Sequence, residues 1–250
     1  MAEALVHTVA FAVRLRAGQV LATVDRQVQS QQSESLGAQI RVAEADARLA
    51  QNELDRAKTL AAPINVIMYW WSKVPTTPYL SSDHFADLKV LEANWEVIRD
   101  EAQALADKGL IKVSAEYNDV GFNSFFKVGW KRFYLKWYED GHPSAAELCP
   151  KTTALVRSLD SVKAAMYTEL PPGSRLVKHR DPFAGSLRYH LGLITPNDDR
   201  CFIDVDGERY SWRDGEGVMF DETYIHYAEN MTDQNRIISW HSNPSKPRYT

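Results

Sequence analysis

The second half of the chain carries its hydrophobic residues in short runs, many of which alternate with polar positions. Alternation with a period of two predicts strands, because successive side chains of an extended segment point to opposite faces. Turn residues separate the runs, and Asp206-Gly207 between two of them predicts a tight two-residue hairpin. The strands expected on this basis cover residues 162–170, 174–179, 186–194, 201–212, 216–222, 223–230 and 236–240.

Many short strands at regular spacing predict a sandwich or a barrel. Among such folds, the double-stranded β-helix, or jelly roll, encloses a pocket for a small molecule. A helical period precedes the strands: between residues 84 and 110, Leu88, Leu91 and Ile98 lie on one side, and Gly109 suits a helix end. We therefore expect a mainly β protein, a jelly roll with flanking helices.

Residues 1–62 differ in composition, because they are rich in Ala, Gln, Glu and Arg and contain no Trp, Tyr or Pro. From Leu36 to Ala61, small or apolar residues recur at alternating steps of four and three, a heptad pattern typical of a coiled coil. The seam is mostly alanine and buries little area per turn, so an ordinary amphipathic helix is the alternative. We therefore divide the chain into a coiled-coil-like helical segment, 1–62, and a jelly-roll domain, 63–250.

Composition excludes several classes of protein. The chain has 250 residues, 44% of them hydrophobic, and its net charge of −4 argues against nucleic acid as a partner. Two cysteines, Cys149 and Cys201, make no disulfide framework and favour a reducing compartment. The sequence contains no run of 18 or more apolar residues, so it predicts no membrane-spanning helix. We expect a cytoplasmic protein, with peripheral attachment to the inner membrane left open.

His179 and Asp181 lie two residues apart on a predicted extended segment, so both side chains point to one face. A second histidine, His226, follows 47 residues after His179, in another predicted strand. Two imidazoles and one carboxylate on one side of a metal leave the opposite positions open, which suits Fe(II) that binds a cosubstrate and O2. A His-x-Asp pair is also common by chance, and a capped turn before Pro182 is the alternative. The candidate metal ligands and catalytic residues are His179, Asp181 and His226.

Four further residues fall where a dicarboxylic cosubstrate such as 2-oxoglutarate would need them. Arg236 follows His226 by ten residues and offers a guanidinium fork to a carboxylate. Arg188 and His190 share one face of a strand that is otherwise apolar, where a buried polar group is costly without a partner. An anionic ligand is such a partner. Thr168 could donate a hydroxyl group, although threonine in a strand needs no special explanation.

A resemblance to the aspartyl/asparaginyl β-hydroxylase family, and within it to the lipid A 2-hydroxylase branch, is carried by KHRDPFAGSLRYHLGLITPN, DGERYSWRDGEGVMFDETYIHYAEN and the strand of Arg236. The resemblance covers roughly residues 69–238. It implies a jelly-roll oxygenase that depends on iron and 2-oxoglutarate, with His179 and His226 as metal ligands. The peptide hydroxylases of the family have Gly where this chain has Asp181, which favours a complete triad here. The matches to the family's cosubstrate contacts are Arg188, His190 and Arg236.

Basic and aromatic residues are interleaved between residues 125 and 138. Such mixing can serve phosphate groups at a lipid interface or single-stranded nucleic acid. The alternative is a helix with its aromatic side in the core and its basic side in solvent. Further upstream, Tyr69, Trp70 and Trp71 suit either a membrane interface or a buried entry helix. The candidate substrate-binding residues are Lys127, Lys131, Arg132 and Lys136.

Together these patterns predict an Fe(II)- and 2-oxoglutarate-dependent dioxygenase that uses O2 to hydroxylate an unactivated C–H bond. By resemblance the bond is at C2 of a lipid A acyl chain, so the expected partner is a glycolipid at a membrane surface. Hydroxylation of an aspartyl or asparaginyl side chain in a peptide is the alternative with the same chemistry. A non-catalytic jelly-roll or coiled-coil adaptor is the alternative of a different class.

Overall fold

The computed structural model of the protein describes residues 62–111, 130–138 and 140–244. The coiled-coil-like segment expected at 1–62 therefore lies outside the described residues, apart from its last position. Lys127 also lies outside them.

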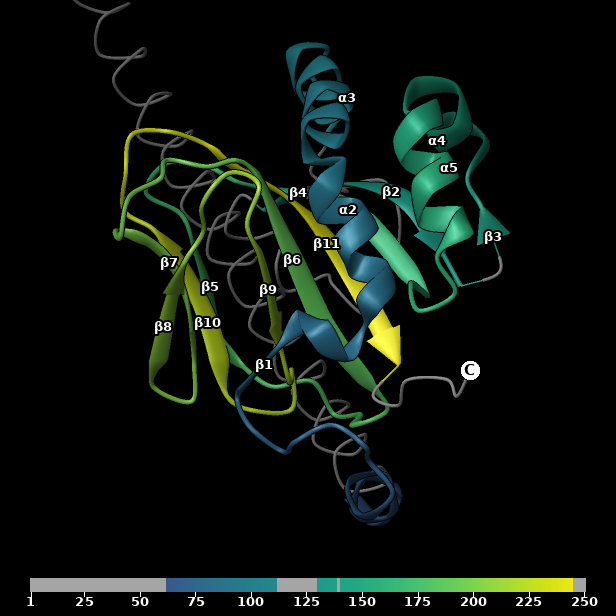
Figure 1. Ribbon diagram of the computed structural model, residues 1–250. Coiled ribbons are helices and arrows are strands. Elements are labelled where there is room, and N and C mark those ends of the chain that lie inside the picture. Colours follow the sequence, from purple (N-terminus) through teal and green to yellow (C-terminus); the bar gives the residue numbers. More distant parts are fainter. Residues whose placement is uncertain (1–61, 112–129, 139, 245–250) are drawn as a thin grey trace, which may run out of the picture. The chain divides into compact units, whose positions relative to one another are not determined.

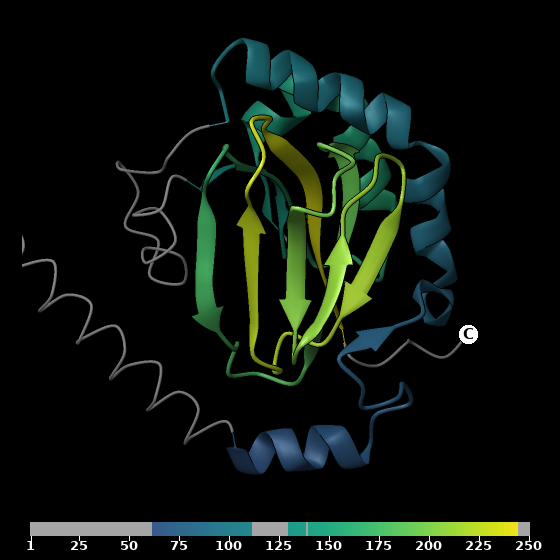
Figure 2. The same ribbon diagram turned by 90° about the vertical axis from the view of Figure 1, so that its left-hand side faces the viewer.

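Two antiparallel sheets form the jelly-roll domain (Figures 1 and 2). The larger contains, in spatial order, β1 (Tyr79–Leu80), β9 (Gly217–Phe220), β6 (Ser186–Ile194), β11 (Arg236–Pro244), β4 (Ala164–Leu170), β2 (Lys131–Trp137) and β3 (Asp140–Gly141). The smaller contains β5 (Arg175–His179), β10 (His226–Asn230), β7 (Cys201–Val205) and β8 (Glu208–Ser211). From β4 to β11 the chain passes back and forth between the sheets, interrupted only by the β7–β8 hairpin. This winding is that of a double-stranded β-helix, so the predicted jelly roll is confirmed.

The hairpin between β7 and β8 has the predicted geometry. Val205 pairs with Glu208, and the two residues between them, Asp206 and Gly207, have φ values of 55° and 91°. Positive φ at both central positions is required by the turn type that suits the twist of two adjacent strands.

Helices cover the outer face of the larger sheet (Figure 1). They are the 3₁₀ turns η1 (Ser82–His84) and η2 (Ala86–Leu88), then α2 (Lys89–Ala93), α3 (Trp95–Asp107), α4 (Pro143–Leu148) and α5 (Pro150–Ser158). The prediction of one continuous helix over 84–110 is wrong, because the segment is divided into two 3₁₀ turns and two α-helices. At Asn94 the backbone leaves the helical region (φ −114°, ψ 18°), and the side-chain amide donates to the carbonyl of Val90 at 2.8 Å. No helix in the described ranges is both long and apolar enough to cross a membrane.

The larger sheet uses its two faces differently, as the strand β6 illustrates. Leu187, Tyr189 and Leu191 belong to the hydrophobic core that the sheet shares with the helices. The intervening residues Arg188 and His190 line a pocket between the two sheets. The core between the sheets consists of Trp130, Ala164, Met166, Leu170, Cys201, Ile203, Val205, Trp212, Val218, Phe220, Ala228, Ile238 and Trp240.

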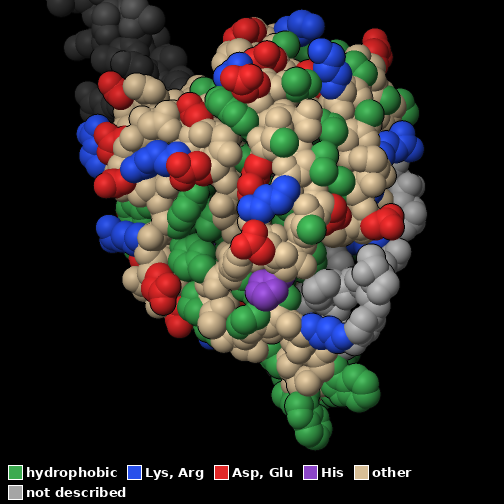
Figure 3. Space-filling model, viewed as in Figure 1, with side chains coloured by type: hydrophobic (Ala, Val, Ile, Leu, Met, Phe, Trp, Pro, Cys, Tyr) green, Lys and Arg blue, Asp and Glu red, His purple; other side chains and the backbone are tan. Residues whose placement is uncertain are grey.

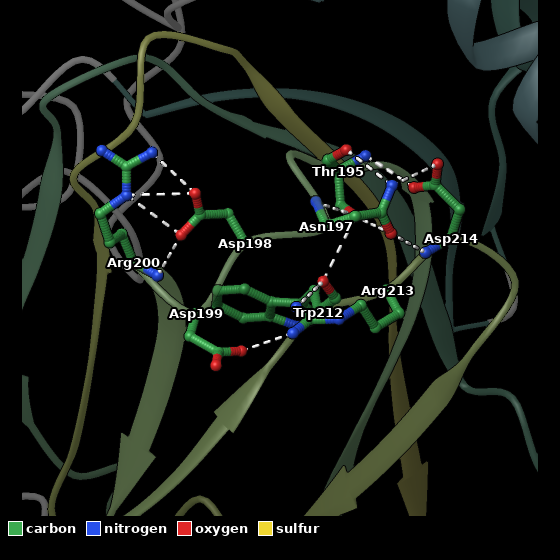
Figure 4. Close-up of polar contacts among 8 residues, drawn as sticks. All are labelled: Thr195, Asn197, Asp198, Asp199, Arg200, Trp212, Arg213 and Asp214. Carbon is green, nitrogen blue, oxygen red and sulfur yellow. Dashed lines mark hydrogen bonds and ion pairs between the residues drawn. The ribbon is translucent and has the colours of Figure 1, made fainter.

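A polar network joins the loop after β6 to the turn before β9 (Figure 4). The N–H of Thr195 donates to the Asp214 carboxylate at 2.7 Å, and the Thr195 hydroxyl donates to the carbonyl of Trp212 at 3.3 Å. A Cβ atom at Gly192 would lie 2.0 Å from the carbonyl oxygen of Arg213, so only glycine permits this close approach. These contacts hold the backbone at Trp212 and directly after it, and Trp212 lines the pocket between the sheets.

Candidate active site

The two histidines expected at the metal lie side by side. His179 ends β5, His226 begins β10, and the two residues are partners in the antiparallel register. Their ring centroids are 4.2 Å apart. Each ring donates from Nδ1 to a backbone carbonyl two residues earlier, that of Val177 at 2.7 Å and that of Tyr224 at 2.9 Å. Because a carbonyl can only accept, Nδ1 of each ring carries a proton, which leaves Nε2 as the atom that could bind a metal ion.

The surroundings favour the neutral form of His226. Burial is the larger cause and the neighbouring His179 the next, and together they lower the pKa of His226 to about 4. The ring is therefore neutral near pH 7, and the neutral imidazole is the form that binds metals.

Asp181, the expected carboxylate ligand, is engaged by an arginine. Arg188 donates from Nη2 to Asp181 Oδ2 at 3.1 Å, and it also pairs with the buried carboxylate of Glu222. Within the described ranges, no group of three or more His, Cys, Asp or Glu side chains is placed to hold a metal ion. The structure thus brings two imidazoles together and directs the nearby carboxylate to a guanidinium.

The pocket between the sheets brings together the residues that the sequence singled out. It has a volume of about 570 Å³, including its open mouth. The seven residues expected to bind metal or cosubstrate all line it: His179, Asp181, His226, Arg188, His190, Arg236 and Thr168. The remainder of the lining is aromatic or aliphatic: Trp130, Leu176, Ile203, Trp212, Phe220, Tyr227, Ala228, Ile238 and Trp240.

Arg236 is a buried cation, with 1% of its surface exposed. Its Nη2 lies 3.4 Å from Thr168 Oγ1, and its guanidinium carbon lies 4.4 Å from the centre of the Trp212 ring. Its Nε has no hydrogen-bond partner, and no carboxylate in the described part of the chain pairs with it. Burial lowers the pKa of Arg236 to about 10, so the group remains charged at pH 7. Such a cation is costly to bury, and a bound carboxylate would offset the cost.

His190 adds a second polar group without a partner. It is buried, and neither ring nitrogen has a hydrogen-bond partner among the residues that the structure covers. Burial, followed by the charges of Arg236 and Arg188, holds the pKa of His190 well below its ordinary value. The neutral ring retains one N–H group, which could donate a hydrogen bond to a ligand in the pocket.

Sequence reasoning missed Glu222 and the aromatic partners of the arginines. Glu222 is buried, and the guanidinium carbon of Arg188 lies 3.9 Å from the centre of the Trp240 ring. A buried arginine needs an acidic partner, so the sequence could have predicted that some Asp or Glu pairs with Arg188. The sequence does not show which acid meets it, because Glu222 is 34 residues from Arg188 and reaches it through the pairing of β9 with β6.

The described members of the basic group expected to bind substrate do not form one surface. These three, Lys131, Arg132 and Lys136, lie on the strand β2, so the helical alternative is wrong for residues 131–137, while Lys127 lies outside the described residues. Lys131 pairs with Glu169 at 2.7 Å, and Lys136 donates to the carbonyl of Val156 at 3.2 Å. Arg132 is buried, with its guanidinium carbon 4.9 Å from the centre of the Tyr134 ring. Alternation along a strand explains the separation, because Lys131 and Arg132 point to opposite faces.

The fold and the pocket define a jelly-roll protein whose site suits a metal ion and an anionic ligand. The chain belongs to the aspartyl/asparaginyl β-hydroxylase family, whose pattern matches residues 92–240. The predicted family is therefore confirmed, and it is a family of hydroxylases.

Individual proteins resemble this chain over part of their length. An ornithine lipid ester-linked acyl 2-hydroxylase from Rhizobium tropici is 37% identical over 110 residues, which are 44% of this chain and 39% of that protein. The human aspartate beta-hydroxylase domain-containing protein 2 is 31% identical over 190 residues, covering 70% of this chain and 50% of that protein. The chain thus spans half or less of the length of these relatives. Among solved structures, the non-haem α-ketoglutarate-dependent carbocyclase SnoK is 14% identical with a TM-score of 0.43, covering 61% of this chain and 75% of that one.

Proposed function

We propose that this chain is the catalytic domain of an Fe(II)- and 2-oxoglutarate-dependent hydroxylase. The observation that carries the proposal is Arg236, a buried cation without a carboxylate partner in the described structure, which lines the same pocket as the pair His179 and His226. A dicarboxylate that binds a metal at the histidines and reaches Arg236 would supply the missing negative charge. Membership of a hydroxylase family supports the same class of reaction.

In this proposal His179 and His226 hold the iron through Nε2, and Asp181 is the candidate third ligand. Iron and 2-oxoglutarate, when bound, supply an oxidant from O2 that converts a C–H bond into C–OH while 2-oxoglutarate becomes succinate and CO2. The residues of the chain bind and orient the reactants. Arg236 holds the far carboxylate of 2-oxoglutarate, and the Thr168 hydroxyl beside it donates a further hydrogen bond.

The other walls of the pocket contribute by orientation and by excluding water. His190 offers one N–H group to the anionic cosubstrate. Arg188 keeps a positive charge close to the histidines, but it is already paired with Asp181 and Glu222 and so differs from Arg236. The aromatic lining excludes water, which strengthens every charged contact inside the pocket.

We further propose that the acceptor is a fatty acyl chain of a membrane lipid, hydroxylated at C2. The relative from Rhizobium tropici supports this choice, since its name states 2-hydroxylation of an ester-linked acyl chain. Lipid A, the acceptor expected from the sequence, is the first candidate, and ornithine lipid is the second. The largely apolar lining of the pocket suits a methylene chain better than a charged side chain.

Succinate release tests the proposal. The protein should release succinate from 2-oxoglutarate only when Fe(II) and O2 are present, and His226→Ala should abolish the release. Lipid A, ornithine lipid and a peptide containing Asp and Asn should be compared as acceptors. We expect mass spectrometry to find one added oxygen on an acyl chain. No turnover with any acceptor or without one would contradict the enzymatic assignment, and hydroxylation of the peptide alone would replace the lipid by the peptide alternative.

A further inference from the structure

Residues 62–70 are helical and carry an exposed apolar surface. Asn65, Met68 and Tyr69 are half-buried and share one side of the helix by their spacing. The other positions are exposed, and Trp70 and Trp71 have 86% and 67% of their surfaces exposed. Figure 3 shows hydrophobic side chains that protrude from the lower end of the domain. The apolar surface consists of Ile64, Val66, Ile67, Trp70 and Trp71.

The half-buried side of this helix is fastened to two loops. Asn65 donates from Nδ2 to the carbonyl of Pro182 at 2.8 Å and accepts from the N–H of Ala184 at 2.9 Å. The hydroxyl of Tyr69 is hydrogen-bonded to Thr223 Oγ1. The helix therefore has a defined position against the jelly roll, with its apolar side turned outward.

Both loops lead directly to the candidate ligands. Pro182 follows Asp181, and Thr223 precedes His226 by three residues. In Figure 2 the helix, drawn in dark blue, lies across the end of the sheets at which β5 ends and β10 begins. Phe183, between the two residues that Asn65 binds, is also exposed and adds to the apolar surface. The apolar surface thus stands beside the entrance of the site.

Two exposed basic residues lie close to the apolar surface along the chain or at its attachment. Residues 62–82 contain no Asp or Glu, and their only charged residue is Lys73, which is exposed. Arg180 is exposed two residues before Pro182, where the helix is attached. Exposed tryptophans with basic neighbours match the interface of an anionic bilayer, because indole rings favour the headgroup level and Lys and Arg are attracted to acidic lipids.

We propose that residues 62–71, with Phe183, Lys73 and Arg180, bind the surface of a bilayer containing anionic lipids and turn the pocket entrance toward it. The inference rests on the proposed function, since an acyl-lipid hydroxylase must meet its substrate at a bilayer. It commits to lipid as the occupant, because exposed tryptophans beside the exposed cations Lys73 and Arg180 match the headgroup level of an anionic bilayer.

Co-sedimentation of the full chain with vesicles tests this surface without iron or 2-oxoglutarate. Vesicles of phosphatidylcholine with phosphatidylglycerol should bind the protein, and vesicles of phosphatidylcholine alone should bind it less. Changing Trp70 and Trp71 together to Ser should lower the partition coefficient by roughly a hundredfold. Lys73→Gln with Arg180→Gln should lower it by roughly 30-fold at low salt and less at high salt. The matched control is Val90→Ser with Met231→Ser, which removes two exposed apolar side chains elsewhere and should change nothing.

Each outcome separates this surface from the catalytic proposal. The inference would be overturned if the wild type and the Trp70/Trp71 variant, at equal thermal stability, bound vesicles equally. It would also be overturned if the wild-type protein did not bind anionic vesicles. A wild-type dimer that the same variant dissociates, without vesicle binding, would identify a second copy as the occupant and also overturn it. Protein that binds vesicles without releasing succinate would contradict the proposed function alone. Protein that releases succinate but does not bind vesicles would contradict only the proposed membrane-binding surface.

Discussion

Replacing Arg236 by methionine should act in opposite directions on the free protein and on its complex with 2-oxoglutarate. In the free protein the guanidinium is buried, and burial lowers its pKa to about 10, a depression that corresponds to ~3 kcal/mol. Methionine keeps much of the volume and removes the charge. Since no carboxylate in the described chain loses a partner, we expect the free energy of unfolding of the iron-free protein to stay constant or rise by about 1–3 kcal/mol.

The same change should weaken the cosubstrate complex. Removing one member of a buried, hydrogen-bonded charge pair costs ~2–5 kcal/mol, which is roughly a 30- to 5,000-fold rise in the dissociation constant. Anaerobic titration of the Fe(II)-loaded protein with 2-oxoglutarate, followed by the visible absorbance of the chelate, measures this constant. Arg236→Lys should recover only part of the affinity, because one ammonium cannot copy the two-pronged contact. Iron affinity should not change.

Arg209→Met is the matched control, because Arg209 also lies over an aromatic ring, 4.2 Å from the centre of Phe202, but is exposed to solvent. It should leave cosubstrate affinity unaltered. Two results for the Arg236 variant would refute the reasoning. Unchanged 2-oxoglutarate affinity would mean that another cation holds the far carboxylate. A loss of several kcal/mol in the stability of the iron-free protein would mean that Arg236 stabilises the fold rather than awaiting a ligand.

Three further predictions concern the metal, the ring beneath Arg236 and the pH dependence of stability. His226→Ala should abolish iron binding in anaerobic metal analysis, and Asp181→Ala should reduce it less because Asp181 is already paired with an arginine; wild-type iron content in the His226 variant would contradict the assignment. Trp212→Leu should raise the dissociation constant of 2-oxoglutarate by roughly 2- to 30-fold through the lost ring contact with Arg236, without changing iron affinity; an equal loss of both would point to a general collapse of the pocket. His241 is buried, and burial, followed by the charge of Lys136, lowers its pKa to about 3. Below pH ~6.5 the histidine therefore binds a proton in the unfolded chain but stays neutral in the folded chain, which lowers the stability of the fold. Urea unfolding should therefore show ~1.4 kcal/mol more loss of stability between about pH 7.5 and 5.5 in wild type than in His241→Gln, and identical losses would contradict this contribution.

The sequence predicted the strands better than it predicted their partners. The pattern of residues 186–194 matches β6, and Asp206-Gly207 forms the expected hairpin, because alternation and turn chemistry are local properties. The interruption at Asn94 was not foreseen, since apolar spacing continues across it from Leu91 to Ile98. Local patterns do not record where a helix bends to follow a sheet.

The candidate site shows the same division between local and distant information. Spacing and family resemblance singled out seven residues, and one pocket contains them all. Neither source indicated that Arg188 is shared by Asp181 and Glu222, because that contact depends on the register between β9 and β6. The basic residues around Lys131 were grouped by proximity in sequence, and an extended backbone then sent neighbours to opposite faces.

The two faces of β6 have a consequence for how such a protein can change over evolutionary time. Leu187, Tyr189 and Leu191 pack in the core shared with the helices, whereas Arg188 and His190 line the pocket, so packing and pocket occupy alternate positions of one strand. The contacts with the helices and the lining of the pocket can therefore change independently, at alternate positions of the strand. Deleting one residue inside β6 would exchange the two registers and lose both properties at once. A change in the length of the strand therefore disturbs both faces, whereas a substitution disturbs one.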